Sequence, residues 1–343
     1  KPRFARYMRK RDDVVIKEKA EKVSTEKIQL VIKIFNELSE HEKRNGQKFK
    51  AVSYRKVIEG LKKMNSDIDL TEHNIKSIKG VGDSLYKKID DIKKTGTTPS
   101  YESIKDIKDP RKEFMNIHRV GPKKAKELVD AGYESIEGLR KSKDKGDILN
   151  NVQLLGLKHY EDLLLRIPYE EIQKHETLLK NALAKVDKSA ELTIAGSYRR
   201  KKGDSGDIDV LLTSTDKATY DKFIKKLKKD AYLIEDLAFG RKKYNGISKL
   251  GRDGSGRRID IMYTKPGEYP FAILYFTGSK DFNQMMRKLA NDKGYSLNEY
   301  NIEKFGDDPK VKTVIDPEQV SIKEEKDIFN FLEMGYVEPW QRL

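Results

Sequence analysis

Three aspartates stand in segments that otherwise read as strands. Asp207 and Asp209 lie two residues apart at the start of the apolar stretch DIDVLLT, and Asp260 lies in RRIDIMYT. Aspartate is uncommon within strands, and strand residues two apart project from one face. Clustered carboxylates repel one another unless a cation lies between them, and Mg²⁺ prefers oxygen ligands. The pattern predicts a site for two Mg²⁺ ions, with Mn²⁺ as an alternative. A solvated acidic strand end would explain only Asp207 or Asp209 alone.

A phosphate-binding turn is predicted directly before the first two aspartates. Gly196 and Ser197 favour a tight turn that exposes N–H and hydroxyl groups, and Arg200 adds a positive charge. Such groups suit a triphosphate. Together with the carboxylates, they predict in-line nucleotidyl transfer assisted by two metal ions.

Two glycine-containing turns, each followed by a lysine-rich helix, form a second kind of candidate site. They are IKGVGDSLYKKIDDIKKTG, residues 78–96, and IHRVGPKKAKELVDAG, residues 117–132. Glycine lets a backbone approach a phosphate closely, and the N–H groups that open a helix bind anions. We interpret both as helix-hairpin-helix elements that hold nucleic acid without reading its sequence, with Na⁺ or K⁺ at their turns. The DNA-binding residues expected in them are Gly80, Gly82, Gly121 and Lys123. A plain helical turn remains the alternative, above all in the second stretch, where Arg119 replaces the first glycine.

The elements that position these residues change in character along the chain. Helical periodicity dominates the N-terminal half, and strand-like segments with intervening helices dominate the rest, which predicts an α+β fold. The predicted segments are a basic mobile arm (1–23), a helical DNA-binding domain (24–94), a linker (95–110), a second helical DNA-binding subdomain (111–165), a catalytic sheet subdomain (166–277) and a C-terminal subdomain (278–343).

Composition narrows the class of protein. The 343 residues include 71 Lys and Arg against 56 Asp and Glu, a formal net charge of +15, which favours a polyanionic partner and nucleic acid first. The absence of cysteine excludes disulfides, thiol catalysis and cysteine-bound zinc. No apolar run approaches the roughly 20 residues of a membrane span, and no signal-peptide pattern opens the sequence. We therefore expect an intracellular protein that binds no membrane, nuclear if its source is eukaryotic.

Several motifs in a fixed order resemble those of the family X DNA polymerases, over nearly the whole chain after residue 24. They are GSYRRKKGDSGDIDVLLT, RRIDI, ILYFTGS, KGYSLNEY and GYVEPWQR, preceded by the two hairpin stretches. The resemblance implies an all-helical N-terminal lyase-like domain with a helix-hairpin-helix. A nucleotidyltransferase-type polymerase domain would follow, with a helical DNA-binding part, a mixed-sheet palm and a small α/β C-terminal subdomain. It further implies a monomeric DNA repair polymerase that adds dNTPs in gapped or nicked double-stranded DNA during base excision repair.

The resemblance also implies roles for residues of the polymerase domain. Asp207 and Asp209 would hold both metals, and Asp260 would hold the catalytic one and help deprotonate the primer 3′-OH. The nucleotide contacts it implies are Ser197, Arg200, Gly206 and Arg166 at the triphosphate; Tyr275, Phe276 and Gly278 at the sugar; and Asn283 and Arg287 at the minor-groove edge and template.

In the N-terminal module the resemblance implies 5′-deoxyribose-phosphate lyase activity. Lys88 would form the Schiff base, and Lys50, Tyr54 and Lys76 would hold the 5′-phosphate end or position the sugar. A Schiff-base lysine needs an unprotonated amine, and nearby cations such as Lys87 and Lys76 would lower its pKa. The adjacent Lys87 remains a competing nucleophile.

Some residues depart from the family's pattern, and other functions remain open. The departures are Lys280 at the incoming base, Gln284 near the template base, Met262 after the third aspartate, where the family's arginine helps control closure, and Phe49 and Ser84 in the N-terminal module. One alternative is a template-independent terminal transferase. The resemblance implies that family members with this activity have a long loop before the third aspartate, whereas this sequence has only GRDGSG there. A small-molecule or RNA nucleotidyltransferase and a non-catalytic gapped-DNA-binding scaffold are further alternatives.

Overall fold

A computed structural model describes residues 26–64, 70–308, 310–318 and 320–342. The predicted basic arm, residues 1–23, lies outside the described residues. The chain forms two compact units, Lys1–Ile148 and Leu149–Leu343, and each is described by itself.

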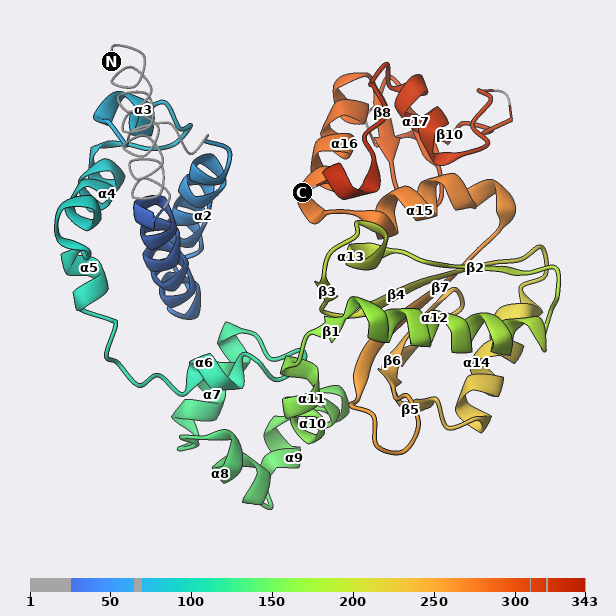
Figure 1. The fold of residues 1–343 in the computed structure, drawn as a ribbon, viewed down its shortest axis with the longest axis horizontal. Coiled ribbons are helices and arrows are strands. Elements are labelled where there is room, and N and C mark those ends of the chain that lie inside the picture. Colours follow the sequence, from blue (N-terminus) through green and yellow to red (C-terminus); the bar gives the residue numbers. More distant parts are fainter. Residues whose placement is uncertain (1–25, 65–69, 309, 319, 343) are drawn as a thin grey trace, which may run out of the picture. The chain divides into compact units, whose positions relative to one another are not determined.

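The described part of the first unit is helical (Figure 1). A helix over residues 26–44 ends shortly before Gly46, which has a φ of 76°. The helices that follow are α2 (Lys48–Lys62), α3 (Glu72–Lys76), α4 (Asp83–Thr95), α5 (Pro99–Glu102), α6 (Arg111–Phe114), α7 (Pro122–Asp130), α8 (Ile136–Lys141) and α9 (Lys145–Ile148).

The first helices of this unit share one apolar core. Val31 and Phe35 of the first helix are fully buried, together with Ile89 of α4. Tyr101 and Ile104 pack against the same core, so the first part of the predicted linker 95–110 contributes to this packing. Apolar side chains placed there gain burial that a solvated connection would not offer.

The second unit contains every described strand and the remaining helices. In chain order these are α10 (Asn151–Lys158), α11 (Tyr160–Leu164), β1 (Ile167–Pro168), α12 (Tyr169–Ala184), β2 (Glu191–Ile194), α13 (Gly196–Arg199), β3 (Asp204–Ser205), β4 (Ile208–Thr213), α14 (Ala218–Lys229), β5 (Leu233–Phe239), β6 (Lys243–Ser248), β7 (Arg257–Thr264), η1 (Pro266–Glu268), α15 (Tyr269–Thr277), α16 (Lys280–Asp292), β8 (Tyr295–Leu297), β9 (Ile302–Phe305), β10 (Lys312–Val314), α17 (Glu325–Phe331) and η2 (Pro339–Gln341).

The division between the units lies inside the predicted subdomain 111–165. Lys124 Nζ donates a hydrogen bond of 3.0 Å to the Ile148 carbonyl, which ties α9 to α7. Beyond that point the side chains bond to the sheet instead, since Asp162 accepts from Gly256 N at 2.7 Å and Lys158 lies 2.5 Å from Glu235. Polar contacts of α10 and α11 therefore connect these helices to the second unit.

A five-stranded mixed sheet, in the order β2-β4-β7-β6-β5, forms the frame of the second unit. β4 and β7 are parallel, and the other neighbours are antiparallel. α12 and α14 lie across one face (Figure 1), where alternate residues such as Val210 and Ile261 are fully buried. Leu211 and Met262 point to the other face and pack against α15. Asp209 and Asp260 share that second face, because they lie two residues before Leu211 and Met262.

A second, three-stranded sheet in the order β10-β9-β8 packs with α16 and α17 in the C-terminal part. Glu325 of α17 is almost fully buried between Arg199, at 2.8 Å, and Arg342, at 2.5 Å. Burial opposes its ionisation, but the hydrogen bonds from both arginines outweigh burial and lower the pKa of Glu325. The ion pair joins the C-terminal part to the turn at α13.

The α+β architecture is confirmed: a helical N-terminal part precedes a mixed sheet and a small α/β C-terminal part. Among the residues that the structure describes, no helix is both long and apolar enough to cross a membrane.

The pH dependence of stability provides a test of this packing. His175 of α12 is fully buried, with Nδ1 2.7 Å from Tyr232 Oη and with Glu171 and Arg257 nearby, and burial lowers its pKa to about 4. The unfolded chain, with an ordinary histidine pKa of about 6.5, binds more protons below that pH. Stability should therefore be lost as the pH falls from about 6.5 towards 4, by about 2 kcal/mol between pH 7 and pH 5.

The measurement is the urea-unfolding midpoint at both pH values, followed by the emission of Trp340. His175→Gln keeps a hydrogen-bonding group beside Tyr232 but does not titrate, so its midpoint should fall less between pH 7 and pH 5. Equal pH dependence in both proteins would contradict the assignment.

Candidate active site

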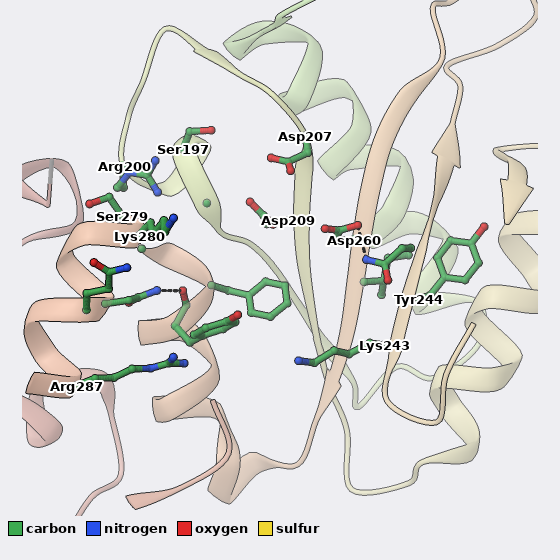
Figure 2. Close-up of a pocket in the computed structure, with 18 residues that line it drawn as sticks. Ser197, Arg200, Asp207, Asp209, Lys243, Tyr244, Asp260, Ser279, Lys280 and Arg287 are labelled. Carbon is green, nitrogen blue, oxygen red and sulfur yellow. Dashed lines mark hydrogen bonds between the residues drawn. The ribbon is translucent and has the colours of Figure 1, made fainter. Parts of the chain in front are cut away.

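A pocket of about 660 Å³ in the second unit lies on the α15 face of the sheet (Figure 2). Strand residues form one side of this pocket, the α13 turn forms another, and α15 and α16 form the third. Its lining includes Gly196, Ser197, Arg200, Asp207, Asp209, Lys243, Tyr244, Asn245, Asp260, Ile261, Tyr275, Phe276, Gly278, Ser279, Lys280, Asn283, Gln284 and Arg287.

The three predicted aspartates converge in this pocket. Asp209 of β4 and Asp260 of β7 are register partners on parallel strands, and Asp207 immediately precedes β4. One carboxylate oxygen from each residue lies within 4.8 Å of the others, and Figure 2 shows the three side chains turned towards a common point. The prediction that they form one cluster is confirmed.

Electrostatics at this cluster favour a bound cation. Burial and the neighbouring Asp260 raise the pKa of Asp209 to about 7, although Arg200 partly opposes the shift. Each cause destabilises the charged carboxylate, and the attraction of a divalent cation would offset both. The donor set consists of carboxylate oxygens alone, which fits Mg²⁺ or Mn²⁺ better than a soft metal.

Two polar side chains that the sequence reasoning missed hold these carboxylates. Arg258 pairs with Asp207, and Asn245 Nδ2 donates a hydrogen bond of 2.6 Å to Asp260 Oδ1. Arg258 stands beside the third aspartate in RRIDI, and Asn245 is a polar residue within the strand KYNGIS. Either could have been suspected from these positions. The pairing itself depends on the antiparallel register of β6 with β7.

The predicted phosphate turn lies beside the carboxylates. Gly196 has a φ of 56°, and a Cβ atom on it would lie 2.0 Å from Asp209 Oδ2, so only glycine fits there. Ser197 Oγ donates to Ser205 Oγ at 2.7 Å. Arg200 donates to the Thr277 carbonyl, while its buried Nε has no partner among the described residues. Arg200 lines this polar pocket, and its cationic guanidinium suits an anionic ligand.

Gly206 and Arg166, predicted at the triphosphate, are not among the described lining residues of this pocket. Arg166 instead pairs with Asp204 at 2.8 Å, in a neighbouring two-stranded ribbon of β1 and β3. A Cβ on Gly206 would lie 3.0 Å from Arg166 Nη1, so these two residues are neighbours. Gly206 and Arg166 are therefore neighbours of each other, and neither is among the described residues that line the pocket.

The residues predicted at the sugar and the base line the opposite side of the pocket. Tyr275, Phe276 and Gly278 end α15, and Asn283 Nδ2 donates to the Tyr275 carbonyl at 2.7 Å. The Arg287 guanidinium lies over the Tyr275 ring, 5.3 Å from its centroid. Lys280 and Gln284, which depart from the family's pattern, lie on α16 together with Asn283 and Arg287 and also line the pocket.

A separate pocket of about 520 Å³ in the first unit contains most of the predicted lyase residues. Lys88, Lys50, Tyr54 and Ser84 line it, whereas Lys87 is not among its described lining residues. The Lys88 ammonium donates to Ser100 Oγ. The sequence reasoning missed Ser100, His41 and Glu42, which also line this pocket; no motif marked them.

Lys76 differs from its expected position. It lies outside the described lining of the pocket and forms ion pairs of 2.7 Å with Glu72 and with Asp83. Hydrogen bonds to these two carboxylates raise the pKa of Lys76. Two neighbouring carboxylates therefore compensate the charge of Lys76.

The two glycine turns have the same backbone conformation. Gly82 and Gly121 are the N-caps of α4 and α7, with φ and ψ of −98° and −178° in one and −100° and −179° in the other. Two residues earlier, Gly80 has a φ of 96° and Arg119 has a φ of 65°. Arg119 thus keeps the left-handed conformation that glycine provides in the first turn, at some conformational cost.

Comparison with known proteins gives matches over most of the chain. A DNA polymerase lambda from Rattus norvegicus is 31% identical over 329 residues, covering 93% of this chain and 55% of the relative. A DNA polymerase lambda from Arabidopsis thaliana is 28% identical, covering 91% of this chain and 61% of the relative. A DNA nucleotidylexotransferase from Xenopus laevis is 23% identical, covering 90% and 67%. The chain therefore spans little more than half the length of the two polymerase lambda relatives.

Four family models match consecutive parts of the chain. They are a helix-hairpin-helix domain (27–98), the fingers domain of DNA polymerase lambda (112–164), the DNA polymerase beta palm (166–266) and the DNA polymerase beta thumb (272–343). The palm match includes all three clustered aspartates. With these models in order along the sequence, the chain belongs to the family X DNA polymerases and resembles DNA polymerase beta.

Proposed function

We propose that this chain is a DNA repair polymerase that adds dNTPs to a primer 3′-OH in short gaps, with two divalent metal ions at Asp207, Asp209 and Asp260. The observation that carries the proposal is the convergence of three carboxylates on one pocket that also contains the α13 turn. Two bound Mg²⁺ ions would lower the pKa of the primer hydroxyl and neutralise charge on the leaving pyrophosphate.

The chain's own residues would bind and orient the substrates. Ser197 and the guanidinium of Arg200, which both line the pocket, offer donors to the triphosphate. The backbone at Gly278, with a φ of 66°, would approach the sugar closely and disfavour a 2′-hydroxyl. Asn283 and Arg287 would contact the base pair and the template. We propose that Arg166 and Gly206 also contact the triphosphate. For this, Arg166 would release Asp204, its present ion-pair partner, and bind a phosphate group instead.

A template-independent terminal transferase is the second candidate, because one relative is a DNA nucleotidylexotransferase. The connection between β6 and β7 opposes it: Ser248 pairs with Arg257, so only residues 249–256 lie between the strands. The family resemblance implies a long loop there in members that dispense with a template. A non-catalytic scaffold, the remaining alternative, would not need the carboxylate cluster.

We further propose 5′-deoxyribose-phosphate lyase activity in the first unit, with Lys88 as the Schiff-base nucleophile. The half-buried position of Lys88 in a pocket with Lys50, Tyr54 and Ser84 supports it. Burial and Arg44 lower the pKa of His41, so this imidazole is neutral at neutral pH and could accept a proton during elimination. The proposed substrate of both activities is gapped or nicked double-stranded DNA in base excision repair. We propose that the protein acts as a monomer and that Na⁺ or K⁺ binds at the hairpin turns.

Asp260→Ala should abolish polymerisation without destabilising the fold. Loss of a core catalytic group lowers turnover by about 10³-fold or more. The substitution also removes a carboxylate that repels Asp209, so the melting temperature in metal-free buffer should not fall. The assay is primer extension on gapped, recessed and single-stranded DNA, with wild type most active on the gap.

Asp221→Ala is the matched control, because Asp221 is an exposed carboxylate on α14, across the sheet from the pocket. It should extend primers like wild type. Extension by Asp260→Ala at the wild-type rate would refute the metal site. Preference of the wild-type protein for single-stranded DNA would instead favour the terminal transferase.

Gly82→Ala and Gly121→Ala should weaken DNA binding while the protein folds normally. A Cβ at either position meets nothing within 4 Å, and both φ values are negative, so the folded state accepts alanine. The added methyl would keep a DNA phosphate from the turn. Each change should reduce affinity for gapped duplex about 10-fold, or ~1.4 kcal/mol, with no dependence on sequence and a shallower salt dependence.

Fluorescence anisotropy at several salt concentrations gives both quantities. Gly267→Ala is the control, since its Cβ also meets open space but it lies in η1. If both hairpin variants bound gapped DNA as tightly as Gly267→Ala, the phosphate-binding interpretation would be wrong.

Lys88→Ala should remove most borohydride trapping of a 5′-deoxyribose-phosphate end and leave gap filling nearly intact. The chemistry needs an amine and no metal, so wild-type trapping should persist in EDTA, which stops polymerisation. Lys87→Ala should trap normally, because Lys87 is exposed. Full trapping by Lys88→Ala would mean that another residue is the nucleophile. If the wild-type protein formed no trapped adduct, the proposed lyase activity would be wrong.

A further inference from the structure

We propose that Trp340 is a positioning residue for the triphosphate-binding turn, acting through Lys201. This inference rests on the proposed polymerase function, because it assigns the turn at α13 to the incoming dNTP. Lys201 Nζ lies 4.2 Å from the centroid of the Trp340 ring, a distance typical of a cation–π interaction. Trp340 lies near the end of the chain and Lys201 directly follows Arg200.

The turn depends on Lys201 having an unusual backbone conformation. Its φ is 56°, in the left-handed region that residues other than glycine seldom adopt. Lys201 N donates to the Tyr198 carbonyl at 2.9 Å, and Lys202 N donates to the Ser197 carbonyl at 3.1 Å. These two bonds close the turn that carries Ser197 and Arg200. A strained conformation persists only when its surroundings hold it.

Three consecutive cations of this turn each have a partner on a later part of the chain. Arg199 bonds to Glu325 at 2.8 Å and to Thr277 at 2.6 Å. Arg200 donates to the Thr277 carbonyl. Lys201 has the face of Trp340. The residue in the middle of this series is the one proposed to bind the triphosphate, so both of its neighbours are held by the C-terminal part of the unit.

The segment that carries Trp340 is itself anchored. Arg342, two residues later, is 1% exposed, and its guanidinium bonds to Glu325 at 2.5 Å and to the Val337 carbonyl at 2.9 Å. Glu338 N donates to Gln341 Oε1 at 3.2 Å, which closes the short helix η2. Trp340 is therefore fixed at its backbone although its side chain is 46% exposed. A half-exposed indole without a core role requires another explanation, and contact with Lys201 provides one.

Loss of the ring should loosen Lys201 and with it the position of Arg200. An exposed cation–π contact has a modest effect, so Trp340→Ala should raise the KM for dNTP about threefold and leave kcat nearly unchanged. Trp340→Phe, which keeps an aromatic face, should recover most of the affinity. In the double variant Trp340→Ala with Lys201→Gln, the KM for dNTP should be no higher than in the more impaired of the two single variants, because both changes break the same contact.

Phe239→Ala is the matched control. Phe239 is 53% exposed and lies under Lys228, with Nζ 5.0 Å from the ring centroid, but it does not line the pocket. Its removal should leave the KM for dNTP unchanged. An equal rise in KM for Phe239→Ala would mean that any exposed cation–π pair of this unit has the same effect, and would overturn the inference.

Emission of Trp340 gives a second readout, because the chain contains one tryptophan. Titration of the full chain with dATP and Mg²⁺ should change the emission of wild type, and Lys201→Gln should abolish most of that change. An unchanged KM in Trp340→Ala, or the same emission change in Lys201→Gln as in wild type, would overturn the inference while wild type still fills gaps. Failure of wild type to incorporate nucleotide would instead refute the proposed function.

Discussion

Repulsion among Asp207, Asp209 and Asp260 is the constraint on which the second unit depends. Parallel pairing of β4 with β7 brings Asp209 and Asp260 into register, and burial together with the neighbouring Asp260 raises the pKa of Asp209. Val210 and Ile261, the next residues along the strands, are buried under α12 and α14 on the other face. Packing of that face therefore holds the carboxylates together.

The same constraint explains the polar contacts around the site. Arg258 and Asn245 compensate part of the charge on Asp207 and Asp260, and Gly196 leaves room for Asp209. The arrangement resembles other functional sites in which local strain is tolerated because the surrounding fold is rigid.

In the helical unit, two turns expose backbone N–H groups at the start of a helix. The two turns superpose in conformation at Gly82 and Gly121, although Arg119 stands in one where Gly80 stands in the other. A left-handed arginine costs some stability compared with glycine. Arg119 adopts this conformation all the same, so the geometry of the turn outweighs the local preference of the residue.

The sequence by itself determined the order of elements, the α+β class and the three aspartates, because alternation along DIDVLLT and RRIDIMYT and the glycine turns are local signals. Contacts between distant segments were not available from it. The hydrogen bond from Asn245 to Asp260 depends on strand register. Arg166, predicted at the triphosphate, forms an ion pair with Asp204, which the sequence did not indicate. The choice between Lys87 and Lys88 as a pocket residue also required the tertiary structure, since adjacent helical residues point in different directions and only packing decides which one faces a cavity.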